Sequence, residues 1–432
     1  MEDWLVAFLV FTLTVATIVL RVVDETVAAL AGLVVLVVLT EYTPEQAFHA
    51  VDWNVIAILF GMWVITGYMI EGGLAERVLE AVARRSGNYR VFLLATALAA
   101  GFVSMFVDNV LVILVFGGVV LEAARRSGGN PVLAILLVGF SANFMGTALL
   151  MGDLPPQLLH SVAGAEFWDF IVHSGRPGSF PLLTVTFLST LAVYYLLFVR
   201  REPSALPRVS KPQSSRWEPW LLPVSVAFFA ATVAAMAVRP LLGVPLGFIT
   251  VAGAAATALF MEAARKAGCR VPSFEDVLSH VEWRALLFYA ALFSLVGGLE
   301  ETGALQMLAF KLVPLLEDGS LKAYTASYWI VAALSTFIEH DALLLTFLYT
   351  VRDASQAIGL DPWPLYWAMA WSATLASNAT TAAAPALYVA VTMAEEAGYR
   401  IGARDFLRYS IPFVAISLSI HYLVTAPIWG VG

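Results

Sequence analysis

Residues 104–110 read S-M-F-V-D-N-V and place an acid and an amide, Asp108 and Asn109, inside an otherwise apolar run. The apolar arm on each side of this motif is well short of the roughly 20 apolar residues that a membrane-spanning helix needs. Two short arms that meet at a polar tip are typical of a hairpin that enters the membrane and returns. We therefore predict a re-entrant hairpin over about residues 91–121.

The composition is that of a helical membrane protein. Of the 432 residues, 60% are hydrophobic and 13% are charged, whereas soluble proteins carry about 25% charged residues. Apolar blocks recur along nearly the whole chain, so we expect an all-α polytopic protein of the plasma membrane, surrounded by lipid and without a nucleic-acid partner. The single Cys269 excludes an internal disulfide framework. We interpret the first apolar segment as a retained helix and not as a signal peptide.

Apolar segments that could cross a bilayer follow one another along the chain. Polar residues interrupt two of them, which predicts broken helices over about residues 131–157 and 363–393. A second hairpin is predicted over about residues 324–352. The predicted spans are 4–20, 27–40, 53–70, 131–151, 180–199, 220–238, 244–261, 284–299, 363–393 and 409–426.

The parts of the chain on either side of a basic linker at residues 200–218 resemble each other. S-M-F-V-D-N from Ser104 matches S-T-F-I-E-H from Ser335, and S-A-N-F-M-G-T-A from Ser141 matches S-A-T-L-A-S-N-A from Ser372. Each half then has five transmembrane helices plus one re-entrant hairpin, which is an odd number of crossings, so the halves must be inverted. The predicted inverted repeats cover residues 1–199 and 219–432.

The basic residues set the predicted orientation. With the N-terminus outside, most of the 24 Lys and Arg residues fall on segments predicted to be inside, as the positive-inside rule requires. We therefore predict that both termini lie outside, that the linker is cytoplasmic and that the hairpins enter from opposite sides. The basic residues predicted to be outside are Arg176, Arg239, Lys311, Lys322 and Arg352.

Polar clusters are expected at membrane depth at the two hairpin tips and the two helix breaks. A carboxylate at the centre of a membrane helix costs about 2.5–3.5 kcal/mol, a cost that is tolerated where the group meets an ion, a proton or water. Unwound carbonyl groups coordinate cations, and the N-termini of half-helices attract anions. The candidate site residues are Ser104, Asp108, Asn109, Asn143, Gly146, Thr147, Asp153, Glu339, His340, Asp341, Ser377, Asn378, Thr380 and Thr381.

Structural explanations compete with a site role for several of these residues. Isolated Asn, Ser and Thr side chains often only bridge membrane helices. Asp153 falls at the predicted outer end of its span, where a solvated loop explains it equally well. Asp108 is flanked by apolar residues on both sides, which favours a functional role. Glu339, His340 and Asp341 suit a proton relay, although in a shallow hairpin they would face outside water.

At these motifs the chain resembles the ion transporter superfamily, and in particular its branch of arsenite-efflux permeases, bacterial sodium/proton antiporters and the melanosomal P protein. F-V-D-N-V and the later G-D-L-P-P-Q are similar to that branch's D-N hairpin and G-D-P-P-N-like break. S-N-A-T-T-A-A-A-P-A is similar to its second break. The resemblance implies scaffold and transport domains, elevator-like motion and a homodimer. Gln157 and the Glu339-His340-Asp341 run depart from the pattern of the branch.

The leading hypothesis is a secondary active transporter of a small ion, most simply a sodium/proton antiporter, because buried carboxylates suit cations and protons. Asp108 would titrate or bind the ion, and sodium would be held at Asp108, Asn109 and Asn143. The coupling ion would be Na⁺ or H⁺, and no other cofactor is expected.

Three alternatives stay open. The same acids could drive transport of arsenite, another small oxyanion or an organic anion, and a passive channel would show a similar sequence. An intramembrane aspartyl protease could use Asp108 and Asp153, but the chain lacks a G-x-G-D signature. It also lacks H-E-x-x-H and phosphate-binding motifs, so we do not expect an enzyme.

Overall fold

The computed structural model describes residues 3–20, 22–205, 216–316 and 320–431, so residues 206–215 of the predicted linker lie outside the described residues. The described chain is almost entirely helical, and a short hairpin formed by β1 (Val172–His173) and β2 (Arg176–Pro177) is its one sheet. By length and composition, five described helices can cross a membrane by themselves: α4, α10 together with η2, α13, α15 and α21.

The helices before residue 205 begin and end as follows. They are α1 (Asp3–Val19), α2 (Glu25–Leu39), α3 (Pro44–Ala50), α4 (Trp53–Glu71), α5 (Leu74–Arg85), α6 (Tyr89–Ser104), α7 (Asn109–Ser127), α8 (Pro131–Met145), α9 (Leu154–Ala163), η1 (Phe167–Phe170), α10 (Ser179–Leu197) and η2 (Val199–Arg201).

The helices after residue 216 follow a similar order of long and short elements. They are α11 (Leu221–Ala237), α12 (Arg239–Leu242), α13 (Leu246–Lys266), α14 (Phe274–Leu278), α15 (Trp283–Glu301), α16 (Ala304–Leu316), α17 (Ser320–Ser335), α18 (His340–Ile358), α19 (Trp363–Ser377), α20 (Pro385–Glu396) and α21 (Ala403–Trp429). The inverted relation of the two halves and their boundaries stay predictions.

The predicted hairpin tips and helix breaks coincide with the ends of helices. Helices α6 and α7 are separated by Met105 to Asp108, and α17 and α18 by a similarly short turn before His340. Helix α8 ends at Met145 and α9 begins only at Leu154, while α19 and α20 are separated by an equivalent gap. The polar motifs therefore lie where helices stop, because their side chains can serve the backbone groups that a helix end leaves unpaired.

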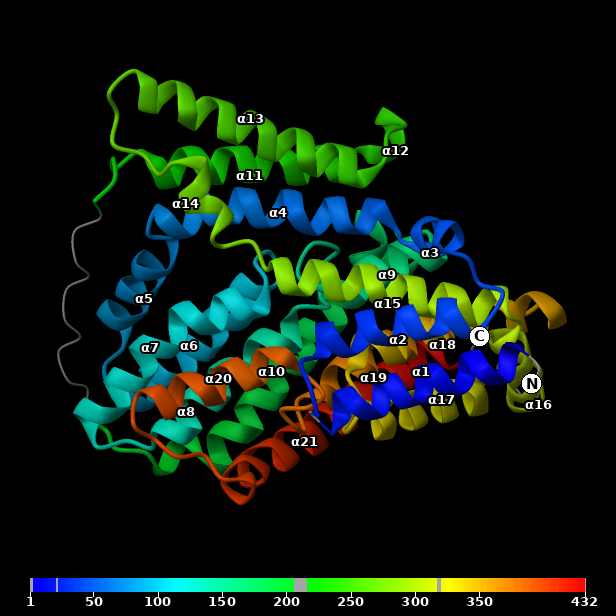
Figure 1. The fold of residues 1–432 in the computed structure, drawn as a ribbon. Coiled ribbons are helices and arrows are strands. Elements are labelled where there is room, and N and C mark those ends of the chain that lie inside the picture. The colour runs from blue at the N-terminus through cyan, green and yellow to red at the C-terminus, as the bar shows by residue number, and fades with distance from the viewer. Residues whose placement is uncertain (1–2, 21, 206–215, 317–319, 432) are drawn as a thin grey trace.

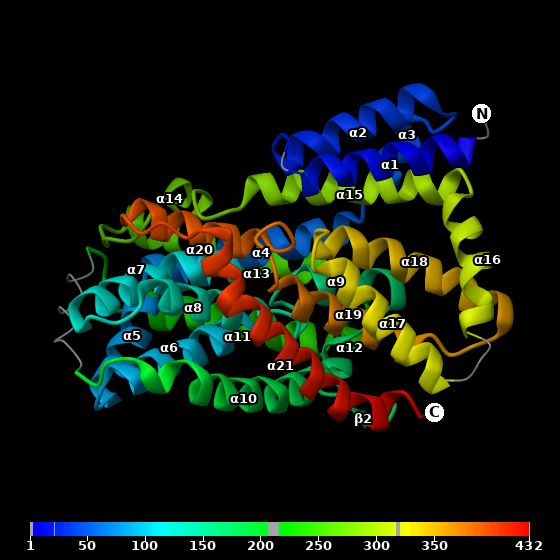
Figure 2. The same cartoon turned by 90° about the horizontal axis from the view of Figure 1, so that it is seen from below.

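Helices from the two parts of the chain pack against each other in an exchanged arrangement (Figures 1 and 2). Helix α4 packs on α11 and α13, whereas α15 packs on α1 and α2. Helices α7 and α8 lie beside α20, and α18 and α19 lie beside α9. Both ends of the chain lie at the same side of the molecule in both views.

Glycines allow the exchanged helices to approach closely. A Cβ atom on Gly61 of α4 would lie 2.5 Å from the carbonyl carbon of Thr250 in α13. A Cβ atom on Gly297 of α15 would lie 2.3 Å from Cβ of Ala50 in α3. Small residues at helix crossings are the usual means by which membrane helices bring their backbones together. These two glycines therefore set how closely α4 packs on α13 and how closely α15 packs on α3.

We expect Gly61→Ala to destabilise the protein, because the new methyl group would push α4 away from the backbone of α13. Overpacking of this kind typically costs about 1–3 kcal/mol. The matched control is Gly118→Ala in α7, since a Cβ atom at Gly118 meets nothing within 4 Å and Ala is a better helix former than Gly. Thermal unfolding of the purified protein should show a lower midpoint for the first variant only. A Gly61→Ala midpoint equal to or above that of the wild type would contradict the packing argument.

Candidate functional site

The N-terminal ends of α7, α9, α18 and α20 meet at one cavity of about 210 Å³. Both hairpin tips and both helix breaks therefore contribute to a single space, although they are far apart in the chain. Its lining residues are Glu25, Asp108, Asn109, Val110, Asp153, Glu282, Arg284, Ala285, Phe288, Tyr289, Glu339, His340, Asp341, Pro385, Ala386, Tyr388 and Val389.

Asp108 begins the second arm of the first hairpin. It is the N-cap of α7, and its Oδ1 accepts hydrogen bonds from the backbone N–H groups of Val110 (2.9 Å) and Leu111 (3.4 Å). Asp is among the residues preferred at this position because its carboxylate satisfies donors that have no partner within the helix. Asp108 is half-buried and lines the cavity, so the same carboxylate holds the hairpin together and presents charge to the cavity.

Asn109 connects the first hairpin to the first helix break. Its Nδ2 donates to Oδ2 of Asp153 at 3.0 Å and to Oδ1 of Asn143 at 3.2 Å. Asp153 is the N-cap of α9 and accepts from the N–H of Leu154 at 2.9 Å through its other oxygen. Asn109, Asn143 and Asp153 are all buried. The carboxylate that the Asn109 amide contacts is thus Asp153, whereas the predicted sodium site combines Asn109 and Asn143 with Asp108.

A second layer of hydrogen bonds joins the two helix breaks behind the cavity. Nδ2 of Asn143 donates to Oγ of Ser377 at 2.9 Å, and that hydroxyl donates to the carbonyl oxygen of Thr374 at 2.9 Å. The hydroxyl groups of Thr147 and Thr374 lie 2.7 Å apart. These buried polar groups satisfy one another, so they fix α8 against α19 and hold Asn143 in position beside the cavity.

The second hairpin places three buried ionisable side chains at its tip. Glu339 is the N-cap of α18 and accepts from the N–H groups of Asp341 (3.0 Å) and Ala342 (2.8 Å). Nδ1 of His340 lies 3.0 Å from the carbonyl oxygen of Ala383. Because a carbonyl oxygen can only accept, Nδ1 carries a proton and Nε2 is directed elsewhere. Nε2 lies 3.6 Å from Oδ1 of Asp341, and neither atom has a hydrogen-bond partner.

The tip of the second hairpin is also the place where a bound cation would find ligands. One ligand atom from each of Glu339, His340 and Asp341 can be chosen so that all lie within 4.8 Å of one another. A carboxylate pair with an imidazole suits a proton or a metal cation. Among the described residues, this is the group of His, Cys, Asp and Glu side chains that is compact enough for such an ion.

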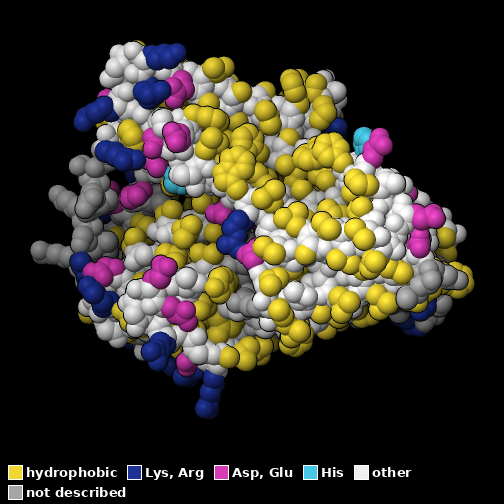
Figure 3. Space-filling view, viewed as in Figure 1, with side chains coloured by type: hydrophobic (Ala, Val, Ile, Leu, Met, Phe, Trp, Pro, Cys, Tyr) yellow, Lys and Arg dark blue, Asp and Glu magenta, His cyan; other side chains and the backbone are white. Residues whose placement is uncertain are grey.

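Helices α15 and α2 supply a wall of the cavity that the sequence did not predict. Glu282, Arg284 and Tyr289 come from α15 and its N-cap, and Glu25 comes from the start of α2. Arg284 forms an ion pair with Asp24, the N-cap of α2. Figure 3 shows charged side chains near the left end of α15, within an otherwise hydrophobic face and beside a hollow.

The explanation of Asp153 as part of a solvated loop is wrong. The helix stops at Met145, and the chain returns so that Asp153 is buried at the cavity. Of the other candidates, Asn143 and Ser377 lie in the hydrogen-bonded layer together with Thr147. The candidates that line the cavity besides Asp153 are Asp108, Asn109, Glu339, His340 and Asp341. The candidates that do not line the cavity are Ser104, Asn143, Gly146, Thr147, Ser377, Asn378, Thr380 and Thr381.

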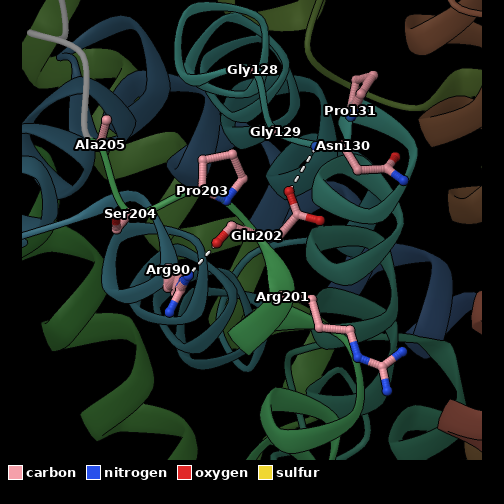
Figure 4. A pocket seen from close by; sticks show the side chains of 10 residues that line it. All are labelled: Arg90, Gly128, Gly129, Asn130, Pro131, Arg201, Glu202, Pro203, Ser204 and Ala205. Carbon is pink, nitrogen blue, oxygen red and sulfur yellow. Dashed lines mark hydrogen bonds between the residues drawn. The ribbon is translucent and has the colours of Figure 1, made fainter.

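A second depression lies on the surface between α6, α8 and the end of η2 (Figure 4). Arg90 donates from Nε to the carbonyl oxygen of Glu202 at 2.6 Å, and the carboxylate of Glu202 accepts from the N–H of Asn130 at 2.7 Å. The polar groups drawn in this depression thus join neighbouring segments of the protein. We assign it a structural role.

Comparison with known proteins identifies the family. Residues 15–372 match a family described as citrate transporter. The chain belongs to the citrate transporter family. It is 27% identical to an uncharacterized transporter of Mycobacterium bovis over 92% of each chain. It is 24% identical to the P protein of Sus scrofa, over 96% of this chain and 58% of that protein.

Two solved transporters share the fold. The YdaH transporter of Alcanivorax borkumensis aligns with a TM-score of 0.59 at 14% identity, over 99% of this chain and 98% of its own. MtrF of Neisseria gonorrhoeae aligns with a TM-score of 0.64 at 12% identity, over 100% and 96%. The protein is therefore a membrane transporter within the superfamily that its motifs resemble, and this membership speaks against the protease hypothesis.

We expect Asp153→Ala to destabilise the protein more than Asp153→Asn. Alanine removes the acceptor of the Leu154 N–H group, a loss of about 1 kcal/mol for an N-cap. It also takes a buried partner from Asn109, and such losses cost about 1–3 kcal/mol. Asparagine keeps one acceptor oxygen, which can still serve the Leu154 N–H group, although its NH2 group cannot accept from Asn109. Thermal unfolding of the two purified variants measures the difference, and equal midpoints would show that the Asp153 hydrogen bonds contribute nothing to stability.

Proposed function

We propose that this protein is a secondary active transporter in which a proton or a sodium ion binds among the acids of the cavity and drives movement of a second ion. The supporting observation is the convergence of Asp108, Asp153, Glu339, His340 and Asp341 on one space between helices. Ionised carboxylates in one cavity repel each other, so each further negative charge costs more free energy than the one before. The cluster therefore favours the binding of a proton or a cation.

The magnitude of the repulsion supports this view. Two unit charges 4 Å apart interact by about 4 kcal/mol at an effective dielectric constant of 20. Backbone donors offset part of this energy at Asp108 and Glu339, and the imidazole of His340 offsets more when it is protonated. Binding and release of a proton or cation would then change the energy of the site by several kcal/mol, which is the range that coupling requires.

Within this proposal the cation has two half-sites. The first consists of Asp153 with Oδ1 of Asn143, where an incoming cation would displace the Nδ2 group of Asn109. The second consists of Glu339, His340 and Asp341. We thus propose that sodium binds at Asp153, and not at Asp108 as predicted from the sequence. Asp108 would then be a titrating group at the cavity.

Alternating access would follow the predicted topology. The cavity wall includes Glu25, Glu282 and Arg284, which belong to segments predicted to be cytoplasmic, so we assign the present conformation to an inward-facing state. The inverted halves would let the site face the other side after the hairpin helices move against α4, α15 and their partners. We propose an elevator-like movement and a homodimer on the basis of the superfamily resemblance.

Transport of a citrate-type anion is the second candidate function. The family description names citrate. Arg284 lines the cavity, as does the start of α20, whose N-cap residue Ala384 makes no side-chain hydrogen bond. An anion in a cavity that six acids line requires some of them to be protonated, so this candidate predicts proton-coupled anion uptake. The arsenite or oxyanion alternative makes the same demand.

We expect Asp108→Asn and Glu339→Gln to reduce sodium-driven proton flux in proteoliposomes at least tenfold, because each removes a charge of the cavity. Both amides keep an acceptor for the helix N-terminus, so the folds should persist. Glu395→Gln is the matched control, since Glu395 is an exposed acid at the end of α20. Wild-type flux in both cavity variants would sink the carboxylate mechanism.

The two candidate functions differ in what the proton flux requires. Sodium/proton antiport should proceed with a sodium gradient alone, whereas proton-coupled anion transport should need citrate or arsenite on one side. We expect sodium alone to move protons through the reconstituted wild-type protein. Uptake of labelled citrate that is driven by a proton gradient and indifferent to sodium would establish the second candidate instead.

A further inference from the structure

Gln157 is a buried amide that the cavity does not explain. Its side chain is 0% exposed, and neither Oε1 nor Nε2 has a hydrogen-bond partner. Leaving buried donors and acceptors unpaired costs about 1–3 kcal/mol for each group, and native proteins rarely tolerate it without a reason. A residue that bears this cost in one conformation is expected to find partners in another conformation or in water that enters the site.

The helical register places Gln157 on a polar face of α9. Asp153 is the N-cap at one end, Gln157 follows four residues later, and Ser161 follows after another four. Residues four apart share a helix face and are separated by about 6 Å along the axis. The hydroxyl of Ser161 donates to the carboxylate of Asp52, the N-cap of α4. Polar groups therefore continue from the cavity at Asp153 to Asp52, on a segment predicted to be outside.

The face of α20 that corresponds to the Gln157 face of α9 is open to the cavity. Asp108 and Glu339 occupy matching positions in the two halves, and Gln157 and Tyr388 are separated by the same number of residues as this pair. Tyr388 therefore occupies in α20 the position that Gln157 occupies in α9. Tyr388 is 52% exposed and lines the cavity together with Pro385, whereas Gln157 is sealed. The cavity is thus open along α20 and closed along α9.

We propose that the face of α9 through Gln157 and Ser161 forms the second aqueous path to the cavity, and that the Gln157 amide contacts the permeant ion or its water when that path opens. This inference rests on the proposed transport function. It makes Gln157 a positioning residue on the outer route, and it explains why an amide is kept at a place where an apolar side chain would be more stable.

Cysteine labelling tests the path without knowledge of the substrate. Cys269 is the one cysteine of the chain, so a Cys269→Ser background allows single cysteines to be introduced by Gln157→Cys and Leu158→Cys. Both positions are 0% exposed in this conformation. In membrane vesicles, a charged thiol reagent that cannot cross the bilayer should label the Gln157→Cys protein at least tenfold faster than the Leu158→Cys protein, and from the outer side. Tyr388→Cys should react from the cytoplasmic side.

Equal labelling at residues 157 and 158, or labelling of 157 from the cytoplasmic side alone, would overturn the path. Unchanged thermal unfolding midpoints confirm that the cysteine variants are folded. If the wild-type protein moves neither sodium, protons nor citrate, the proposed function fails, and the labelling result still decides whether water reaches α9.

A transport comparison tests the role of the amide itself. Gln157→Leu should raise the unfolding midpoint, because it removes unpaired polar groups, and should lower ion flux at least tenfold. Gln157→Asn should restore part of the flux. Thr190→Val is the control, since Thr190 of α10 is also fully buried with an unpaired hydroxyl and should tolerate the change without loss of flux. A Gln157→Leu protein with wild-type flux would refute the positioning role.

Discussion

The structure depends on acidic side chains that cap the N-termini of helices buried among other helices. A helix that begins away from water leaves several N–H groups without partners, and each unsatisfied group in an apolar environment costs several kcal/mol. Asp108, Asp153 and Glu339 accept these hydrogen bonds at the starts of α7, α9 and α18. The turns at these places are therefore stabilised by carboxylates, and these capping groups bring negative charge to the cavity.

The fourth helix start uses a different solution, and this difference makes the cavity asymmetric. Ala384 replaces the capping acid at α20, where Pro385 begins the helix and has no N–H group to satisfy. The acid that the second break lacks is found instead as Asp341 in the second hairpin, beside His340. The second half of the cavity therefore carries this acid in its hairpin and not at its break, so the two halves differ in chemistry although their helices follow a similar order.

The sequence predicted the features that have a local cause. Polar residues inside apolar runs located both hairpin tips and both breaks, since clusters of such residues are favoured where a helix ends and leaves backbone groups unpaired. The depth of Asp153 has a tertiary cause and was missed: Gly152 packs so closely against the first hairpin that a Cβ atom there would lie 2.8 Å from the carbonyl oxygen of Ser104. The wall from α15 and α2 was missed for the same reason, because Glu25 and Tyr289 reach the cavity through helix packing that no local pattern encodes.

The part of the cavity wall that α2 and α15 supply is negatively charged, as is the part at the hairpin tips. Glu282 is the N-cap residue of α15 but makes no side-chain capping bond, whereas Asp52, which occupies the same place before α4, accepts from two N–H groups. The carboxylate of Glu282 lines the cavity together with that of Glu25. The nearby Arg284 is already paired with Asp24. Acids thus outnumber bases along the approach, and clefts of one sign raise the local concentration of oppositely charged ions. A cation approaches this site with the field, while an anion approaches it only after protons have neutralised part of the wall.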